Sequence, residues 1–407
     1  MALSKTDIIN AAFRTWGQTF YQRTSLSDLA RNLGITKAAL YRHFEHKQAL
    51  LDAMYEYFFD RYAAFIKPGY TKARETEDVI ESQFILMRTI VEYYARNADA
   101  FLFALFMVYH KTESEQQVVE LSRRGIDLGN IRHLEEYTQT YPSMLRLIVA
   151  TLIFWVASFH RNADFRNVPP SDEEVGVLIR WLEEKIAGGL GLRREVVEHL
   201  NFEGLDRAVP RNFLDALEDA GLLKAVAEAV AEAGPWNASM DMVARRSGLS
   251  KSGLYAHFKN KQDMIKQLFL TEFERILAYA EAAIGESAVP EEQFYLAIAA
   301  IVDYFRSRPE ILTALDWIKT RRLDWEHPVL PRMGRIFSDI MGEGCPVTEG
   351  LSGSLKEQTS HWILFLTANI LMRLPPGMAI SEFPNKSQRI LYKFIALGVD
   401  GCKSCYK

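Results

Sequence analysis

The stretch Ser25–Gln48, SLSDLARNLGITKAALYRHFEHKQ, returns without a gap as Ser239–Gln262, SMDMVARRSGLSKSGLYAHFKNKQ. Eleven of the 24 positions are identical, far more than chance would give. The match extends upstream as an apolar pattern at the spacing of a helix with one buried face: Ile8, Ile9, Ala12 and Trp16 correspond to Leu222, Leu223, Val226 and Val230. This segment is therefore an internal repeat, and it decides how the rest of the chain is read.

Weaker matches continue through both halves of the 407-residue chain. Val91–Leu105 resembles Val302–Asp316, and Leu178–Leu190 resembles Ser387–Val399. The halves meet near Leu200–Pro210, where Asn201, Gly204 and Pro210 break the periodicity. Long stretches show a 3.6-residue period, glycine and proline fall between them, and no alternating strand pattern stands out. We predict an all-α chain of two tandem units, each about half its length.

The composition sets further limits. With 48 basic and 52 acidic residues, a net charge of -4 and 48% hydrophobic residues, the chain is neither disordered nor polycationic. Leu147–Phe159 and Trp362–Met372 are shorter than the roughly 20 apolar residues of a membrane-spanning helix, and Met1–Asn10 lacks a signal-peptide pattern. Three cysteines suit a reducing cytoplasm. Cys402 and Cys405 form a C-x-x-C pair, for which a free-thiol tail is favoured over a metal or redox role.

The repeated segment predicts two short helices joined by a tight turn. Ser25 is placed to cap the first helix with Asp28 as its capping-box partner, and Gly34 ends that helix. Thr36 is placed to cap the second helix, and the small Ala30 allows the two helices to pack closely. This arrangement is a helix-turn-helix.

The outer side of the second helix is the candidate site. Lys37, Ala38, Ala39, Arg42 and His43 are not needed for the core, and small residues allow close approach to base edges in a major groove. The window Arg23–Gln48 has a net charge of +3 and Asn237–Gln262 one of +4, which leaves -11 on the rest of the chain. Positive charge gathered in this way fits binding to phosphates.

The string from Thr24 to Leu51, TSLSDLARNLGITKAALYRHFEHKQALL, resembles the DNA-binding domain of the TetR family of transcriptional repressors, and Ala238–Ile265 resembles it again. The resemblance implies a three-helix DNA-binding domain at the start of each half, followed by a helical ligand-binding domain that pairs through its last two helices. We expect domains at 1–60 (motif 25–44), 61–200, 201–275 (motif 239–258) and 276–407. The pairing helices would include Leu145–Phe159 with Val175–Ala187, and Thr359–Met372 with Ser387–Leu397.

The resemblance also implies roles for individual residues. The positions that resemble phosphate contacts in the family are Thr24, Ser25, Thr36, Tyr41, His43 and Lys47. Those that resemble its base-reading face are Lys37, Ala38, Ala39 and Arg42. The candidate DNA contacts in the second copy are Ser239, Ser250, Lys251, Ser252, Gly253, Tyr255, His257 and Lys261. The partner implied is double-stranded DNA, with no cofactor and no metal.

Because family members act as homodimers, two copies on one chain suggest an intramolecular pseudo-dimer. Ala38, Ala39 and Arg42 become Ser252, Gly253 and Ala256, so we expect an asymmetric operator. Gly253 should weaken its helix by about 1 kcal/mol relative to alanine. The alternative is a homodimer of two chains in which one motif of each is idle.

In the family, a ligand releases the DNA, and a small apolar ligand is expected here. Core packing is the more common role for the aromatic residues that could line its pocket. These residues are Tyr93, Tyr94, Phe101, Phe103, Phe106, Tyr109, Trp155, Trp317, Trp325, Phe337 and Trp362.

Other functional classes remain as alternatives. A TetR-like scaffold without DNA binding is one, and a DNA-binding factor in cell division or nucleoid organisation is another. No P-loop, dinucleotide fingerprint, G-x-S-x-G or spaced metal-ligand set favours an enzyme. His43 and His46 lack the further ligands of a metal site. The sequence predicts a cytoplasmic, ligand-responsive DNA-binding regulator.

Overall fold

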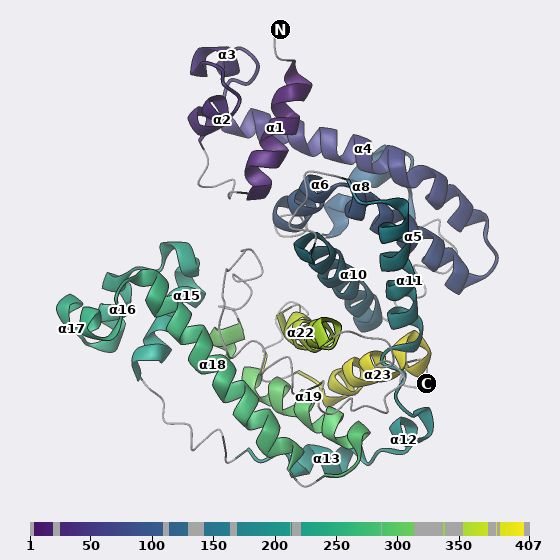
Figure 1. The fold of residues 1–407 in the computed structure, drawn as a ribbon, viewed down its shortest axis with the longest axis vertical. Coiled ribbons are helices and arrows are strands. Elements are labelled where there is room, and N and C mark those ends of the chain that lie inside the picture. Colours follow the sequence, from purple (N-terminus) through teal and green to yellow (C-terminus); the bar gives the residue numbers. More distant parts are fainter. Residues whose placement is uncertain are drawn as a thin grey trace. The chain divides into compact units, whose positions relative to one another are not determined.

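The computed structural model of the chain describes residues 4–18, 25–108, 114–128, 142–162, 169–211, 213, 221–285, 287–312, 337, 353–372, 380 and 383–402. Within these ranges all secondary-structure elements are helices and no strand occurs, which confirms the all-α prediction (Figure 1). No described helix combines the length and the apolarity that crossing a bilayer requires. The chain divides into two compact units, Met1–Thr140 with Trp155–Glu183, and Tyr141–Phe154 with Glu184–Lys407.

The first unit begins with three short helices set at one end of a long one (Figure 1). They are α1 (Lys5–Gln18), α2 (Leu26–Asn32) and α3 (Lys37–Tyr41), and the long helix is α4 (Lys47–Glu75). The first turns of α4 bury Leu50, Leu51 and Met54, and α1 packs on this helix. Because α4 continues as one helix into the body of the unit, it joins the small helical domain to the helices that follow.

The body of the first unit consists of α5 (Val79–Arg96), α6 (Ala98–Phe103), the π-helix η1 (Ala104–Val108), α8 (Ser114–Arg123), the second part of α10 (Pro142–Asn162) and most of α11 (Asp172–Gly188). In this body, α5 packs along α4, and α6 packs against α1 and α5. Phe58, Tyr62, Tyr93 and Tyr94 form a buried aromatic cluster between α4 and α5, with neighbouring ring centroids 5.0 to 5.6 Å apart.

Pro68 and Gly69 lie inside α4, so the expectation that glycine and proline fall between the helices is wrong at this place. A Cβ built on Gly69 would overlap the side chain of Thr89 in α5. Gly69 therefore allows α4 and α5 to approach more closely than any larger residue would.

The second unit repeats the order of the first. Its small domain is α15 (Gly221–Asn237), α16 (Met240–Ser247) and α17 (Lys251–His257), set on the long helix α18 (Lys261–Ile284). The body contains α19 (Pro290–Ser307), which packs along α18, then α22 (Gly353–Met372) and α23 (Asn385–Cys402). The first part of α10 belongs to this unit as well.

The junction between the two halves is folded, although the helical periodicity of the sequence breaks at Leu200–Pro210. It carries α12 (Arg194–His199) and α13 (Phe202–Ala208), and Asn201 caps α13 by accepting a hydrogen bond from the Gly204 amide at 3.0 Å. Asn201 and Gly204 are both compatible with a short capped helix, since asparagine is a favourable N-cap.

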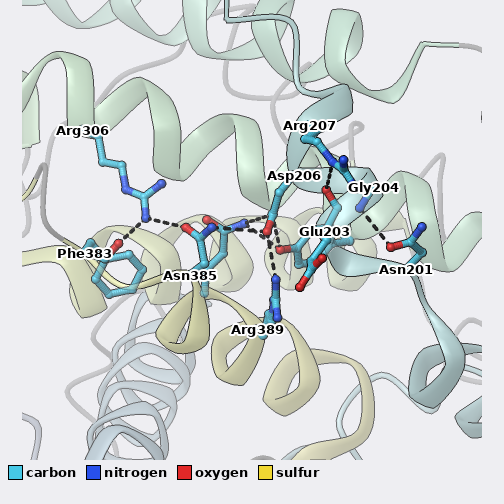
Figure 2. A network of polar contacts seen from close by, with 11 residues as sticks. Asn201, Glu203, Gly204, Asp206, Arg207, Arg306, Phe383, Asn385 and Arg389 are labelled. Atoms are coloured by element: carbon cyan, nitrogen blue, oxygen red, sulfur yellow. Dashed lines mark hydrogen bonds and ion pairs between the residues drawn. The ribbon is translucent and has the colours of Figure 1, made fainter.

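A polar network holds α13 against α19 and α23 (Figure 2). Asp206 accepts hydrogen bonds from the Tyr295 hydroxyl at 2.6 Å and from Arg389 at 3.2 Å, with the amides of Asn385 and Gln388 at 3.4 Å. An ion pair also joins Arg193 to the buried Glu291, with Nη2 and Oε2 2.7 Å apart. The hydrogen bonds from Arg193 hold the pKa of Glu291 below its usual range.

As expected, Cys402 forms no disulfide with a described residue, but it lies at the end of α23 and is fully buried, so it belongs to a packed helix and not to a tail. Its Sγ lies 3.5 Å from the Ile390 carbonyl oxygen. Cys405, the other half of the C-x-x-C pair, lies outside the described residues.

Candidate DNA-binding surfaces

In the first small domain, the predicted capping box of α2 is confirmed. The Ser25 hydroxyl accepts from the Asp28 amide at 3.1 Å, and the Asp28 carboxylate accepts from the Ser25 amide at 2.9 Å. The hydrogen bonds from Ser25 lower the pKa of Asp28. These contacts satisfy amides that the start of any helix leaves unpaired.

The turn between α2 and α3 also follows the sequence prediction. Gly34 has φ +65°, a conformation that side chains with a Cβ rarely adopt. The Ile35 amide then donates to the carbonyl of the buried Ala30 at 3.0 Å, and Thr36 caps α3 by accepting from the Ala39 amide at 3.1 Å. These contacts confirm the predicted helix-turn-helix.

The second small domain has the same design, but the cap of α16 is not a capping box. Ser239 accepts from the Met242 amide at 3.2 Å, and Ser250 accepts from the Gly253 amide at 3.0 Å. Met242 stands where Asp28 stands in the first copy, so it cannot supply the reciprocal carboxylate of a capping box. Gly248, at φ +70°, takes the place of Gly34.

The candidate DNA-contacting residues of the first copy gather around one small domain, with the core residues Leu40 and Phe44 buried beneath them. Those that are exposed are Ser25, Thr36, Lys37, Ala38, Tyr41 and Arg42, and those that are half-buried are Ala39, His43 and Lys47. Tyr41 is 41% exposed, a high value for an aromatic side chain. Thr24 lies outside the described residues.

The second copy presents a similar surface. Ser250, Lys251, Ser252, Tyr255 and His257 are exposed, and Ser239, Gly253 and Lys261 are half-buried. Tyr255 is 49% exposed, at the position equivalent to Tyr41. Contact of either surface with DNA stays a prediction.

The recognition helices differ in length. The helix α3 ends at Tyr41, so Arg42 and His43 follow it instead of lying within it, whereas α17 continues through His257. The His43 amide donates to the carbonyl of Leu40 at 3.0 Å, three residues back, which tightens the last turn. Base reading by Arg42 would therefore come from the end of the helix.

Two helix caps beside the candidate surfaces escaped the sequence prediction. His46 caps α4, its Nδ1 accepting from the Ala49 amide at 3.0 Å, and Asn260 caps α18, its Oδ1 accepting from the Asp263 amide at 2.9 Å. The sequence did contain a signal for these caps, because Asn260 matches His46 in the repeat and asparagine is a strong N-cap residue. Lys47 and Lys261 are consequently the first residues of the two long helices.

Most described candidates for a ligand pocket are core residues. Tyr93, Tyr94, Phe101, Phe103, Trp155, Phe337 and Trp362 are all buried. Burial raises the pKa of Tyr93 to about 12. Tyr109, Trp317 and Trp325 lie outside the described residues, as does the side chain of Phe106.

Two capped helix-turn-helix domains, each on a long helix that enters a helical body, place the chain among the helix-turn-helix DNA-binding proteins. The sequence profile described as "Bacterial regulatory proteins, tetR family" matches residues 8–54 and 222–268. Each half of the chain therefore begins with a tetR-type domain, which gives two TetR-like units in tandem.

The sequence similarity to individual regulators is low. The chain is 28% identical over 78 residues to the "Fatty acid metabolism regulator protein" of Bacillus subtilis (strain 168), a match that covers 19% of this chain and 40% of that protein. Among solved structures, the fatty acid degradation regulator FadR from Bacillus halodurans gives a TM-score of 0.36 at 16% identity, over 42% of this chain and 96% of its own. The regulator PfmR from Thermus thermophilus gives 0.31 at 21% identity, over 44% and 95%.

Proposed function

We propose that the protein is a cytoplasmic, sequence-specific transcriptional repressor that a small ligand releases from DNA. In this proposal its two halves form an intramolecular pseudo-dimer that reads an asymmetric operator. The observation that carries the proposal is a contact between equivalent glycines of the two halves, Gly189 and Gly398.

The two glycines occupy matching positions, because Leu178–Leu190 aligns with Ser387–Val399. Gly189 directly follows the last residue of α11, and Gly398 lies at a kink inside α23. Both have positive φ, +62° and +67°. A Cβ built on Gly189 would lie 2.5 Å from the Gly398 nitrogen, and one built on Gly398 would lie 2.6 Å from the Ile186 oxygen. In a two-fold interface, equivalent residues touch each other only at the symmetry axis. This contact therefore supports a two-fold arrangement of the last helices.

Further contacts join first-half segments to the second half inside the second unit. The Leu190 amide donates to the Ile395 carbonyl at 2.8 Å, and the Leu192 amide donates to the Ala396 carbonyl at 3.2 Å. In α10 and α22, the buried Trp362 Nε1 donates to Thr151 Oγ1 at 3.1 Å. The rings of Phe154 and Phe365 lie 5.5 Å apart. These are the helices through which subunits of the family would pair, so their packing within one chain supports the pseudo-dimer.

A route from body to DNA-binding domain is present in the first unit. Phe13 of α1 packs against Phe103 of α6 with centroids 4.8 Å apart, and the Tyr55 hydroxyl of α4 donates to the Met107 carbonyl in η1. A ligand that shifted α6 and η1 would move α1 and α4 directly. The Bacillus subtilis relative is a fatty acid metabolism regulator by name, so compounds with acyl chains are the first ligands to test.

Selection of bound fragments from random duplex DNA, with the purified full chain, tests the proposal. We expect one site with two unlike half-sites about 34 to 36 Å apart, as for other paired helix-turn-helix proteins. Light scattering should give a mass near 46.6 kDa for the free protein and one chain per site. A perfect palindrome protected equally on both sides, or a mass twice as large, would contradict the pseudo-dimer.

The salt dependence of DNA affinity tests the DNA-binding part alone. Lys47→Ala together with Lys261→Ala should flatten the fall of affinity with salt by about two phosphate contacts. Absence of salt-dependent binding would favour a TetR-like scaffold that does not bind DNA.

A further inference from the structure

The two recognition helices begin with the same residue in different electrostatic settings. Lys37 opens α3 and Lys251 opens α17. The Lys251 ammonium lies 3.1 Å and 3.2 Å from the two carboxylate oxygens of Asp241, in the first turn of α16. The Lys37 ammonium instead lies over the ring of Tyr41, 5.6 Å from its centroid.

Asp241 has no counterpart in the first copy. The gapless alignment of the two repeats places Ser27 at its position. Asp241 is also the sole acidic residue of the window Asn237–Gln262, which contains five lysines and arginines. Among the residues that the structure describes, none forms an ion pair with Lys37. Asp241 thus places a negative charge directly beside the lysine at the start of α17, while Glu228 and Glu232 of the same domain pair with Arg246.

We propose that Asp241 is an electrostatic brake on the second DNA-binding domain, and that it makes the half-site read by the first domain dominant. This inference rests on the proposed function, in which α17 lies against DNA. To bind a phosphate, Lys251 must leave Asp241 or share its charge with it. The carboxylate also stays beside the phosphate and repels it.

Both groups are more than half exposed, 55% for Lys251 and 57% for Asp241, so the pair is easily opened. An exposed ion pair of this kind changes an equilibrium by about one- to fivefold. Repulsion between Asp241 and the phosphate adds to this factor at low salt, where screening is weak. The brake is therefore graded and does not block the domain.

The test uses the full chain and a labelled duplex of roughly three helical turns, long enough for two half-sites. Asp241→Ser, which copies the first domain, should tighten binding about two- to tenfold at low salt and steepen the salt dependence by about one phosphate contact. Ser27→Asp should weaken binding by a similar factor. Glu198→Gln is the matched control, since it removes a carboxylate from an exposed ion pair with Arg194 in α12 and changes the net charge equally.

A double-mutant cycle separates the brake from a structural effect. Lys251→Ala should lower affinity only slightly in the natural chain and several-fold in the Asp241→Ser background, because only there is the lysine free for phosphate. Asp241→Asn, nearly the same shape, should reproduce Asp241→Ser if charge is the cause. Equal affinities for Asp241→Ser, Asp241→Asn and Glu198→Gln would overturn the brake while leaving the proposed function intact. Absence of salt-dependent binding in every variant would overturn both.

Discussion

Gly189 and Gly398 lie where the backbone following α11 passes close to α23, a contact called here the glycine crossing. Replacement of Gly189 by alanine perturbs this crossing in two ways at once. The residue has φ +62°, where a Cβ costs about 1 kcal/mol or somewhat more. The new Cβ would also lie 2.5 Å from the Gly398 nitrogen and 2.5 Å from the Ile395 oxygen, which are backbone atoms that cannot rotate away. Overpacking of this kind costs about 1 to 3 kcal/mol. We therefore expect the crossing to open more easily by about 2 to 4 kcal/mol.

Hydrogen exchange measures this opening locally. The amides of Leu190 and Leu192 donate across the crossing to Ile395 and Ala396, so their exchange requires it to open. A loss of about 2 to 4 kcal/mol corresponds to roughly 30- to 700-fold faster exchange. Local protection is preferable to a global unfolding curve, because a chain of two units need not unfold in a single step.

Two other glycines provide controls. Gly34 has φ +65°, but no atom lies within 4 Å of the position that a Cβ would take, so Gly34→Ala carries the backbone strain alone and leaves the crossing protected. Gly188 lies beside Gly189 in α11 with open space and ordinary φ, so Gly188→Ala should be neutral or slightly stabilising. The reasoning fails if Gly189→Ala leaves the protection of Leu190 and Leu192 within threefold of the natural chain.

Three further predictions rest on single contacts. Asp206→Ala leaves several donors around α13 without their acceptor and should destabilise the junction by about 2 to 3 kcal/mol, seen as faster proteolysis at α13, whereas Arg207→Ala on the exposed side should change the rate little. Burial lowers the pKa of His160, so the stability it contributes is present above about pH 6.5 and is lost as the pH falls below that value. Between about pH 8 and pH 5, the midpoint of thermal unfolding should fall less in His160→Gln than in the natural chain. Parallel curves for the two proteins would contradict a buried, neutral His160. Gly253→Ala should stabilise α17 by up to about 1 kcal/mol, which amide exchange in that helix measures. The new Cβ would lie 3.3 Å from Ser250 Oγ, so this gain requires the Ser250 side chain to move slightly. Faster amide exchange in the variant would show that the Ser250 side chain does not move.

Features of the DNA-binding domains that depend on neighbours in sequence could be predicted. The caps at Ser25 and Thr36 and the turn at Gly34 each involve residues three to five positions apart, and all three are found as expected. Such contacts form whenever the local helix forms, whatever the rest of the chain does. The position of His46 belongs to the same class and was missed only because histidine is an uncommon cap.

The duplication, the helical class and the two capped helix-turn-helix domains could be predicted without a structure. The duplication is a direct match between two stretches of sequence, and helical periodicity and capping depend on residues a few positions apart. The tertiary structure decided which residues from distant segments meet: Gly189 with Gly398, Asp241 with Lys251, and Asp206 with its donors on α19 and α23. An apolar helix face can pack on its neighbours in many registers, and only the packed chain selects one of them. The contacts that distinguish the two halves, and that support their assembly within one chain, arise from that selection.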